Sequence, residues 1–370
     1  MEKGAECMSK TIMHIVGNRP QFIKLAPVSR ELKKRGYNDI IIHTGQHFDE
    51  NMSDVFFEEL SIPKPNENLH VSGGTHAQMT AELMKAIEPV ISTRNPDVVI
   101  VYGDTNSTLA AAITSKKMGK RIVHVEAGVR TGVEFNPEEI NRRMIDHISD
   151  VLCAPDKRAY DDLVKENLGQ KAVFTGDAML DSYLYCQSIV NNNDKYSVNG
   201  IPDHFVLMTW HRQENTSDKI TMEKILEAVR KVKEPVVCPL HPRTRKMLDQ
   251  FGLWNEAESI SNFVIIEPVG YMEMVYLLGK ADWILTDSGG LSKESYYSQK
   301  RCIYMSDLVC WPDLERENWI IHLDSNPDTT YEKLAQLMVE TGSNDEKFYG
   351  DGNAAVKIVD AIENALIVGD

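Results

Sequence analysis

The sequence predicts an α/β protein made of two doubly wound domains with parallel sheets. Short apolar runs rich in β-branched residues alternate with helix-like segments along the chain. Because these runs are apolar throughout, rather than at every second residue, each sheet is expected to be covered by helices on both faces. The runs form two series on either side of the polar stretch at 191–203, and a chain of 370 residues is long enough for two cores.

Each apolar run is bounded by turn residues, which indicate where a strand ends. In the first series the predicted strands are 11–17, 39–45, 98–103, 121–128, 150–155 and 171–176. In the second series they are 205–210, 235–240, 263–268, 283–287, 301–305 and 319–323. We therefore expect a disordered leader over 1–10, an N-terminal Rossmann-like domain over 11–176 and a C-terminal Rossmann-like domain over 177–352. A C-terminal helix over 353–370 is expected to pack back on the N-terminal domain.

The charge and cysteine content of the chain exclude several classes of protein. The net charge is −15, which argues against non-specific binding to nucleic acid or to an anionic membrane. Any anionic ligand must then be held by a local basic cluster. The six cysteines form no Cys-x-x-Cys pair, which argues against a zinc site. With no signal peptide and no apolar run of membrane-spanning length, a cytoplasmic protein is expected.

Two neighbouring predicted strands of the first domain end in a carboxylate. Asp104 directly follows the run 98–103, and Glu126 lies at the end of the run 121–128. Ligands of open α/β sheets bind beyond the carboxyl ends of the strands, where an acid can reach a site while its strand stays buried. A helix N-cap is the alternative role for Asp104, but acids at the ends of two successive strands favour a functional site.

A third acid begins the helix predicted after residue 136. Asn136 is typical of an N-cap and Pro137 of the first helical position, which makes Glu139 the third residue of a capping box. Glu138 is then left without a structural role and is a candidate for catalysis. The alternative for Glu138 is an ion pair with Arg142, four residues later on the helix.

Basic side chains follow predicted strands in both domains, as an anionic ligand requires. Arg19 and Lys24 follow the first strand, and His211 and Arg212 follow the strand at 205–210. A third basic group follows the strand at 235–240 and consists of His241, Arg243, Arg245 and Lys246. A solvated helix start is the alternative role for these residues.

The glycine-rich turn after the strand at 283–287 predicts a phosphate site. Ser288, Gly289 and Gly290 open a predicted helix, whose backbone N–H groups and dipole favour a phosphate. Glu294 follows one turn later, where it can reach a ribose; a simple tight turn is the alternative for the whole segment. An interdomain cleft would bring these groups and the acids of the first domain around a nucleotide diphosphate that carries a sugar.

Taken together, these segments resemble the non-hydrolysing UDP-N-acetylglucosamine 2-epimerases, a family with the two-domain GT-B fold. The resemblance runs from about residue 11 to the C-terminus, and its segments are "GNRPQFIK", "HTGQH", "YGDTNSTLAA", "HVEAGVRTG", "PEEINR", "HRQEN", "DSGG…E" and "GDGNAA". Within this family, "HTGQHFDENMSD", "PLHPRTRK" and "EPVGYMEM" are most similar to the branch that acts on UDP-2,3-diacetamido-2,3-dideoxyglucuronate.

The resemblance implies a role for each matching residue. The implied catalytic residues are Asp104, Glu126, Glu138 and His211. The implied residues for binding UDP or the sugar are Arg19, Lys24, His241, Ser288, Gly289, Gly290 and Glu294, to which we add Arg212 beside the catalytic histidine. Gln46 and His47 lie where an allosteric site of the family is expected, although a structural turn explains them equally well. A homodimer without metal or redox cofactor is also implied.

The implied reaction inverts C2 of a UDP-N-acetylhexosamine through elimination of UDP to a 2-acetamidoglycal, followed by re-addition. Inversion needs a proton carrier on each face of the sugar, which accounts for several carboxylates around one site. The expected role is the supply of precursors for surface polysaccharides, with UDP-N-acetylglucosamine as the substrate or, as the alternative, the diacetamido-uronate. A GT-B glycosyltransferase, a hydrolysing relative and a non-catalytic sugar-nucleotide sensor are further alternatives.

The chain departs from the family pattern at three positions near the expected site. Ser292 stands where a glutamine is usual, and Ser306 and Cys310 stand where an arginine and a glutamate are usual. The loop that holds the last two is expected near the sugar and phosphates, so these changes leave the identity of the sugar open.

Overall fold

A computed structural model of the chain describes residues 10–46, 57–58, 61–62, 64–306, 311–322 and 347–367. They form two parallel sheets, each in its own compact unit, and the prediction of two doubly wound Rossmann-like domains is confirmed. Unit 1 comprises Met1–Ser182 with Lys347–Asp370, and unit 2 comprises Tyr183–Glu346. The predicted leader, apart from Lys10, lies outside the described residues, as do His47 and Cys310.

The sheet of unit 1 has the strand order β3-β2-β1-β4-β5-β6-β7, and its strands pair in parallel. Its strands are β1 (Thr11–Val16), β2 (Asn38–His43), β3 (Glu67–Asn68), β4 (Val98–Tyr102), β5 (Arg121–Val125), β6 (Val151–Ala154) and β7 (Ala172–Phe174). Chain order runs outward in opposite directions from the neighbouring strands β1 and β4. The carboxyl ends of these two strands therefore flank the topological switch point, where ligands of such sheets bind.

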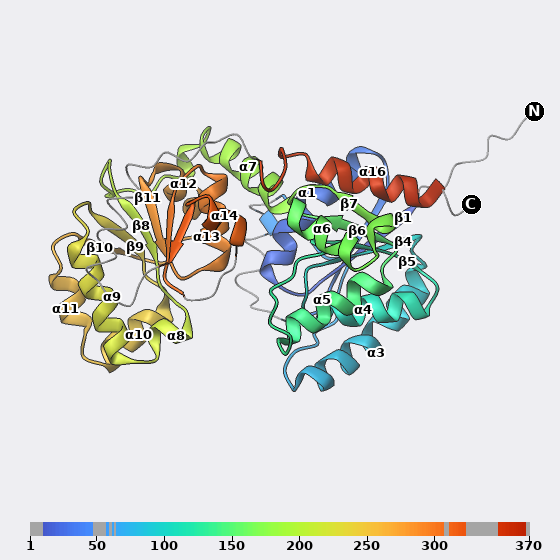
Figure 1. The fold of residues 1–370 in the computed structure, drawn as a ribbon, viewed down its shortest axis with the longest axis horizontal. Coiled ribbons are helices and arrows are strands. Elements are labelled where there is room, and N and C mark those ends of the chain that lie inside the picture. The colour runs from blue at the N-terminus through green and yellow to red at the C-terminus, as the bar shows by residue number, and fades with distance from the viewer. Residues whose placement is uncertain are drawn as a thin grey trace, which may run out of the picture. The chain divides into compact units, whose positions relative to one another are not determined.

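Helices cover both faces of this sheet (Figure 1). One face carries α3 (His76–Arg94), α4 (Asn106–Lys117) and α5 (Pro137–Ile148), and the other carries α1 (Arg19–Lys34) and α16 (Ala354–Ile367). The remaining helices are α6 (Lys157–Lys165), the 3₁₀ turn η1 (Gly169–Lys171) and α7 (Ala178–Val190). Strand β4 is buried along its whole length, as its unbroken apolar sequence predicts.

The C-terminal helix α16 belongs to unit 1 although unit 2 precedes it in the chain. It contacts α1 and β6, and Arg35 Nη1 after α1 donates to Asp360 at 2.6 Å and to Glu363 at 3.0 Å. The Asp181 carboxylate on α7 accepts from the backbone nitrogens of Ala354 and Ala355, at 3.1 and 2.8 Å.

The boundary between the units falls within α7, after Ser182, rather than after Gly176 as the sequence pattern predicts. The reason is that the start of α7 is bound to unit 1. The backbone nitrogen of Asp177 donates to the Tyr349 carbonyl at 2.9 Å, and the Ser182 hydroxyl donates to the Ile23 carbonyl at 2.5 Å. Gly176 has a φ of +83°, and a Cβ there would lie 2.9 Å from the Tyr349 carbonyl oxygen, so this close return of the chain requires glycine.

The sheet of unit 2 has the order β10-β9-β8-β11-β12-β13, again with parallel pairing. Its strands are β8 (Val206–Thr209), β9 (Val236–Pro239), β10 (Phe263–Ile266), β11 (Trp283–Thr286), β12 (Cys302–Tyr304) and β13 (Ile320–His322). Its helices are η2 (Asp194–Tyr196), α8 (Gln213–Thr216), α9 (Lys219–Lys231), α10 (Pro242–Gln250), α11 (Trp254–Ser259), α12 (Tyr271–Lys280), α13 (Gly289–Tyr297) and α14 (Pro312–Arg316). The switch point of this sheet lies between β8 and β11.

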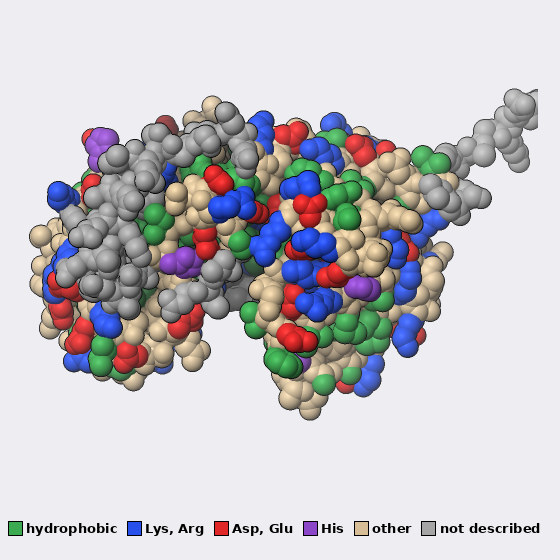
Figure 2. All heavy atoms as spheres, viewed as in Figure 1, with side chains coloured by type: hydrophobic (Ala, Val, Ile, Leu, Met, Phe, Trp, Pro, Cys, Tyr) green, Lys and Arg blue, Asp and Glu red, His purple; other side chains and the backbone are tan. Residues whose placement is uncertain are grey.

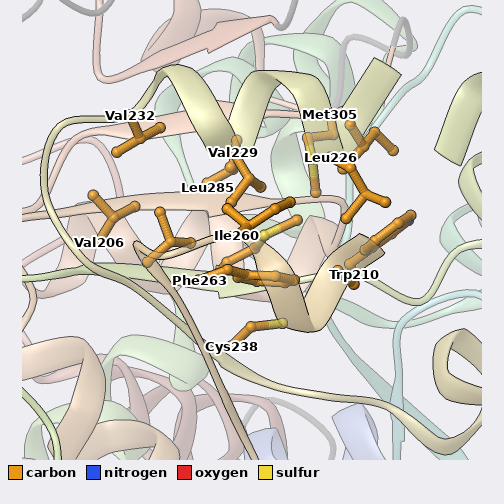
Figure 3. Close-up of a cluster of buried hydrophobic side chains, with 14 of the residues drawn as sticks. Val206, Trp210, Leu226, Val229, Val232, Cys238, Ile260, Phe263, Leu285 and Met305 are labelled. Carbon is orange, nitrogen blue, oxygen red and sulfur yellow. The ribbon is translucent and has the colours of Figure 1, made fainter. Parts of the chain in front are cut away.

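The core of unit 2 anchors the end of β8 (Figure 3). Trp210 is 1% exposed and packs in the cluster with Leu226, Phe263 and Met305. Its indole nitrogen donates to the Asn215 carbonyl at 3.0 Å. The residue that follows the strand, His211, therefore starts from a fixed backbone.

The surface of unit 1 carries charges of both signs. On the face drawn in Figure 2, Lys and Arg side chains are interspersed with Asp and Glu, so local cation sites exist despite the net charge of −15. Among the helices of the described chain, none is both long enough and apolar enough to cross a membrane.

Candidate active site

Asp104 lies in the turn after β4, at the switch point of the first sheet. The N-cap of α4 is Thr105, whose side chain accepts from the Thr108 backbone nitrogen, so the alternative N-cap role of Asp104 is wrong. The Asp104 carboxylate instead forms an ion pair with Arg142 of α5. Its backbone carbonyl accepts from the Asn141 side chain at 2.8 Å. The acid is thus held by α5 and does not cap its own helix.

Glu126 follows β5 in a left-handed backbone conformation, with a φ of +73°. Such a conformation costs roughly 1–3 kcal/mol for a residue other than glycine and is concentrated at functional sites. The Glu126 carboxylate pairs with the Lys24 ammonium group, which is buried on α1. A Cβ at Gly103 would lie 3.1 Å from Glu126 Oε2, so the turn after β4 lies directly against this carboxylate.

Lys24 therefore lies among the acids of unit 1. Burial disfavours its charge, but the carboxylates of Glu126, Asp177 and Asp104 outweigh burial and raise the pKa of Lys24. The lysine supplies a fixed positive charge in a group of acids.

Glu138 and Glu139 differ in burial and in partners. Asn136 is the N-cap of α5 and accepts from the Glu138 and Glu139 nitrogens at 2.8 and 3.4 Å, and Pro137 opens the helix, as predicted. The capping box is wrong, because Glu139 Oε2 accepts from the Thr131 nitrogen and hydroxyl, both at 2.9 Å. Glu139 is 1% exposed, whereas Glu138 is exposed.

Arg142 joins Glu139 to the acid cluster. Its guanidinium group pairs with Asp104 and, at 3.3 Å, with Glu139 Oε2. The alternative pair between Glu138 and Arg142 is wrong for the described chain. Glu138 thus remains an exposed carboxylate, and its negative charge helps to raise the pKa of the nearby Asp104.

The electrostatics of this cluster raise the pKa of Asp104. Burial is the main cause that raises the pKa of Asp104; Arg142 opposes it, and the charges of Glu126 and Glu138 reinforce it. A carboxyl group whose pKa is raised by burial and by neighbouring carboxylates is suited to take up and return a proton.

A buried ion-pair network fixes the two turns that carry Asp104 and Glu126. His124 on β5 contacts the Gly103 carbonyl through Nε2 at 2.8 Å and Asp146 through Nδ1 at 2.7 Å. The second oxygen of Asp146 accepts from the Gly128 nitrogen at 3.1 Å and pairs with Arg130 at 2.8 Å. In the sequence, His124 stands within an apolar strand, and its neighbours along the chain do not indicate this role. The role depends on Gly103, after the neighbouring strand β4, and on Asp146 of α5.

His211 is the first candidate residue of unit 2, directly after β8 and Trp210. Its Nδ1 lies 3.0 Å from Asp287 Oδ1, and its backbone nitrogen donates to Asp287 Oδ2 at 2.9 Å. Asp287 follows β11 and is fully buried. Although burial alone would raise it, the pKa of Asp287 is held below its usual value by the hydrogen bond and charge of His211 and by backbone N–H donors. Asp287 was not predicted as a site residue, although its place after an apolar strand matches that of Asp104.

His241 lies beside His211, with ring centroids 5.6 Å apart. It is the N-cap of α10, where its Nδ1 accepts from the Arg243 nitrogen at 3.1 Å. Burial lowers the pKa of His241, and the nearby His211 and Arg243 lower it further. Arg245 stacks 3.3 Å from the centre of the Trp254 ring and pairs with Asp249, which agrees with the structural alternative for that residue.

The segment 288–294 forms the start of α13. Ser288 is the N-cap and accepts from the Leu291 nitrogen at 3.3 Å, and Gly289 and Gly290 make the first turn. The segment is therefore a helix N-terminus rather than an isolated tight turn. Glu294 is buried and accepts from the Tyr271 hydroxyl at 2.9 Å.

One of the departures from the family pattern, Ser292, lies on this helix, and a second, Ser306, follows β12. The Ser292 hydroxyl donates to the Gly289 carbonyl at 3.0 Å, and Trp311 Nε1 contacts the same carbonyl and the Ser292 hydroxyl at 3.0 and 3.2 Å. Trp311 directly follows the altered loop. The Ser306 carbonyl accepts from His322 Nδ1 on the neighbouring strand.

The remaining predicted residues occupy separate places. Arg19 is exposed at the first position of α1, after the N-cap Asn18. Arg212 pairs with Glu214 at 3.1 Å. Gln46 Oε1 accepts from the Ser107 hydroxyl at 2.6 Å, which gives this residue a structural contact with α4.

Each unit thus brings its own set of predicted residues together at the switch point of its sheet. Unit 1 assembles Asp104, Glu126 and Lys24 with Glu138 on the next helix, and unit 2 assembles His211, His241 and the start of α13. Within the ranges that the structure describes, no group of three His, Cys, Asp or Glu side chains is arranged to hold a metal ion.

The chain is similar to proteins of one enzyme family over nearly its whole length. The family model "UDP-N-acetylglucosamine 2-epimerase" matches residues 30–363. The chain is 41% identical to a UDP-N-acetylglucosamine 2-epimerase homolog of Methanococcus maripaludis, over 95% of this chain and 99% of the relative. It is also 41% identical to the UDP-2,3-diacetamido-2,3-dideoxy-D-glucuronate 2-epimerase of Pseudomonas aeruginosa, over 94% and 98% of the two chains.

A solved structure agrees with this assignment. The Methanocaldococcus jannaschii UDP-GlcNAc 2-epimerase, in complex with UDP-GlcNAc and UDP, superposes with a TM-score of 0.84 at 35% identity and covers 96% of this chain and 100% of its own. The predicted GT-B-like class is confirmed by such neighbours. The two switch-point clusters, the family model and these relatives agree, and the chain belongs to the UDP-N-acetylglucosamine 2-epimerase family, whose members are isomerases of UDP-sugars.

Proposed function

We propose that this protein inverts C2 of a UDP-N-acetylhexosamine, of the UDP-GlcNAc to UDP-ManNAc type, without net hydrolysis. The observation that supports this most is the cluster of acids in unit 1. Asp104, Glu126 and Glu138 gather at one sheet edge, and burial together with its acidic neighbours raises the pKa of Asp104. A transferase needs a single base, whereas inversion of a carbon centre needs proton carriers on both of its faces.

In the proposed reaction a carboxylate of unit 1 takes the proton from C2 as the bond between C1 and the UDP oxygen breaks. The electron pair of that bond leaves with UDP, and a 2-acetamidoglycal remains. A second acid then protonates C2 on the opposite face, and UDP adds back to C1. Lys24 and Arg142, paired with Glu126 and Asp104, hold these two carboxylates in place.

The negative charge that develops on UDP requires donors fixed in advance. We assign this task to His211, to the backbone N–H groups at the start of α13 and to Arg19. The fully buried Asp287 holds His211, and Ser288 caps α13, so neither group has to reorganise when the bond breaks.

We propose UDP-GlcNAc as the substrate, because solved structures of family members contain it. In addition, Ser306 stands where the family usually has an arginine, so one cation that could bind a sugar carboxylate is missing. The second candidate is the diacetamido-uronate, which the 41% identity to the Pseudomonas enzyme favours. Recognition of its C6 carboxylate needs an additional cation, and we propose Arg243 as the candidate for it.

The reaction and the sugar can be tested in two steps. Anion-exchange chromatography after incubation with UDP-GlcNAc should show a new UDP-sugar; free UDP with free sugar would indicate a hydrolase, and no change a sensor. The ratio of kcat/KM for the two sugars then decides between them. A preference for the uronate above about 100-fold, or roughly 2.7 kcal/mol, would make it the substrate.

The wider setting of the activity follows from the substrate. The product is a building block for surface polysaccharides, and a cytoplasmic supply of UDP-sugars is the setting that we propose. The homodimer stays a prediction.

A further inference from the structure

The Asp287 carboxylate accepts several hydrogen bonds from the turn that follows β8. Strands β8 and β11 pair in parallel, and their last residues, Thr209 and Thr286, lie opposite each other. Asp287, which follows β11, therefore lies beside the turn after β8. Asp287 Oδ2 accepts from the backbone nitrogens of His211 and Arg212, at 2.9 and 2.8 Å, and from Asn215 Nδ2 at 3.3 Å. Asp287 Oδ1 also accepts from the His211 nitrogen, at 3.1 Å, and faces the ring of His211, whose Nδ1 lies 3.0 Å away.

This geometry decides which ring nitrogen of His211 carries a proton. An ionised carboxylate can only accept, and the pKa of Asp287 is held below its usual value, so Nδ1 must donate. Nε2 is then the nitrogen that is available to a ligand. The side chain of His211 is 38% exposed and that of Asp287 is fully buried, which places the ligand-binding end of this pair on the His211 side.

Asp287 supplies the negative charge that lies in contact with the ring of His211. His241, on α10, is 5.6 Å away between ring centroids, and burial lowers its pKa, which disfavours a charge on that ring. Arg212, in the same turn, and Arg243, on α10, are cations and disfavour a second positive charge. The Asp287 carboxylate, with Oδ1 3.0 Å from Nδ1, is the anion that lies against this ring.

We propose that Asp287 is a positioning residue for epimerisation, which fixes His211 with Nδ1–H on the carboxylate and Nε2–H toward the diphosphate of the departing UDP. The inference rests on the proposed function. No proton passes between His211 and UDP in this step: the C1–O electron pair leaves with UDP, and the Nε2–H group stabilises the new charge by a hydrogen bond. Asp287 itself does not touch the substrate.

The test is Asp287→Asn, compared with Asn215→Ala as the matched control. Asn at 287 keeps the shape and one acceptor oxygen but removes the negative charge from His211. Ala at 215 removes one bond to Asp287 and a 2.8 Å bond to the Met305 carbonyl, and leaves the contact between Asp287 and His211 in place. Both changes loosen the same turn, and only the first acts on the ring.

We expect Asp287→Asn to lower kcat about 10²-fold at pH 7, the loss typical of one misplaced transition-state donor, with KM changed less than about threefold. Asn215→Ala should lower kcat much less, because the contact between Asp287 and the His211 ring stays in place. An unchanged kcat in Asp287→Asn, or an equal loss of kcat in Asn215→Ala, would contradict the inference.

A second measurement does not depend on activity. The ¹⁵N chemical shifts of the His211 ring, assigned by comparison with His211→Gln, should show a proton on Nδ1 of the neutral ring in the unmodified protein. A proton on Nε2 of that neutral form would overturn the inference even if Asp287→Asn fails to fold. Failure of the proposed function is separate, since it would show as a lack of epimerase activity in the unmodified protein.

Discussion

The neighbouring glutamates at the start of α5 should respond in opposite ways to the same substitution. Glu138→Gln should strongly lower turnover and leave stability nearly unchanged. Glu139→Gln should lower stability and affect turnover much less. The reason is that Glu138 is exposed at the acid cluster, whereas Glu139 is 1% exposed and bonded to Thr131 and to two arginines.

The size of the stability effect follows from the partners of Glu139. A glutamine oxygen can still accept from the Thr131 nitrogen and hydroxyl, but these bonds lose their charge assistance, roughly 1 kcal/mol each. Arg142 also loses one of its two carboxylate partners. A loss of about 2 kcal/mol corresponds to a fall in Tm of about 4–8 °C for a unit of this size. Glu138→Gln should change Tm by no more than about 1–2 °C, since it is a surface substitution.

Thermal unfolding and turnover of the two variants, measured side by side, test this prediction. Glu138→Gln should lower turnover about 10²-fold, and Glu139→Gln less than about 10-fold when assayed well below its Tm. The bonds to Thr131 and the charge of Arg142 outweigh burial and lower the pKa of Glu139. Its contribution to stability is therefore present above the ordinary glutamate pKa of about 4.3 and is lost as the pH falls through the lower pKa of the folded state. Equal losses of Tm, or equal losses of turnover, would refute this division of roles.

Three further predictions concern the site. Asp104→Asn should lower turnover about 10²-fold. Thr105→Ala should lower the free energy of unfolding by about 1 kcal/mol, because α4 loses its N-cap, and should leave turnover nearly unchanged. Both variants can be compared by turnover and denaturant titration, and a large loss of turnover in Thr105→Ala alone would contradict these roles. Turnover in deuterated water should place deuterium at C2 of the product, and retention of the original hydrogen, seen by NMR, would exclude proton removal by the acids. A chelator should leave turnover unchanged, because His211, Arg19 and the start of α13 meet the diphosphate charge; activity that is lost with the chelator and restored by magnesium would contradict this.

The positions that the sequence predicts in agreement with the structure are those set by strand ends. Asp104, Glu126 and His211 each follow an unbroken apolar run, and such runs indicate both a buried strand and the place where its end meets solvent. Asn136 and Pro137 were predictable because a helix start depends on its own few residues.

The assignments that failed depend on partners far along the chain or on a choice between adjacent groups. Thr105 and Asp104 are both good N-caps, and Arg142, 38 residues on, decides between them by binding Asp104. Glu139 finds Thr131 eight residues earlier, because the loop before α5 folds back over the helix start. Asp287 and His211 are 76 residues apart and meet only because β8 and β11 are neighbours.

The position of α16 in unit 1 has a consequence for synthesis on the ribosome. Unit 2 lies wholly within one continuous segment, Tyr183–Glu346, whereas unit 1 is completed by the last residues of the chain. Ala355, Ile358, Val359 and Ile362 of α16 are buried and are synthesised only after the whole of unit 2. The domain that emerges first is thus the last to be finished, and until then its apolar surface around α1 and β6 stays uncovered. A nascent chain stalled before residue 354 should carry a folded unit 2 and an incomplete unit 1 that is vulnerable to proteases and a target for chaperones.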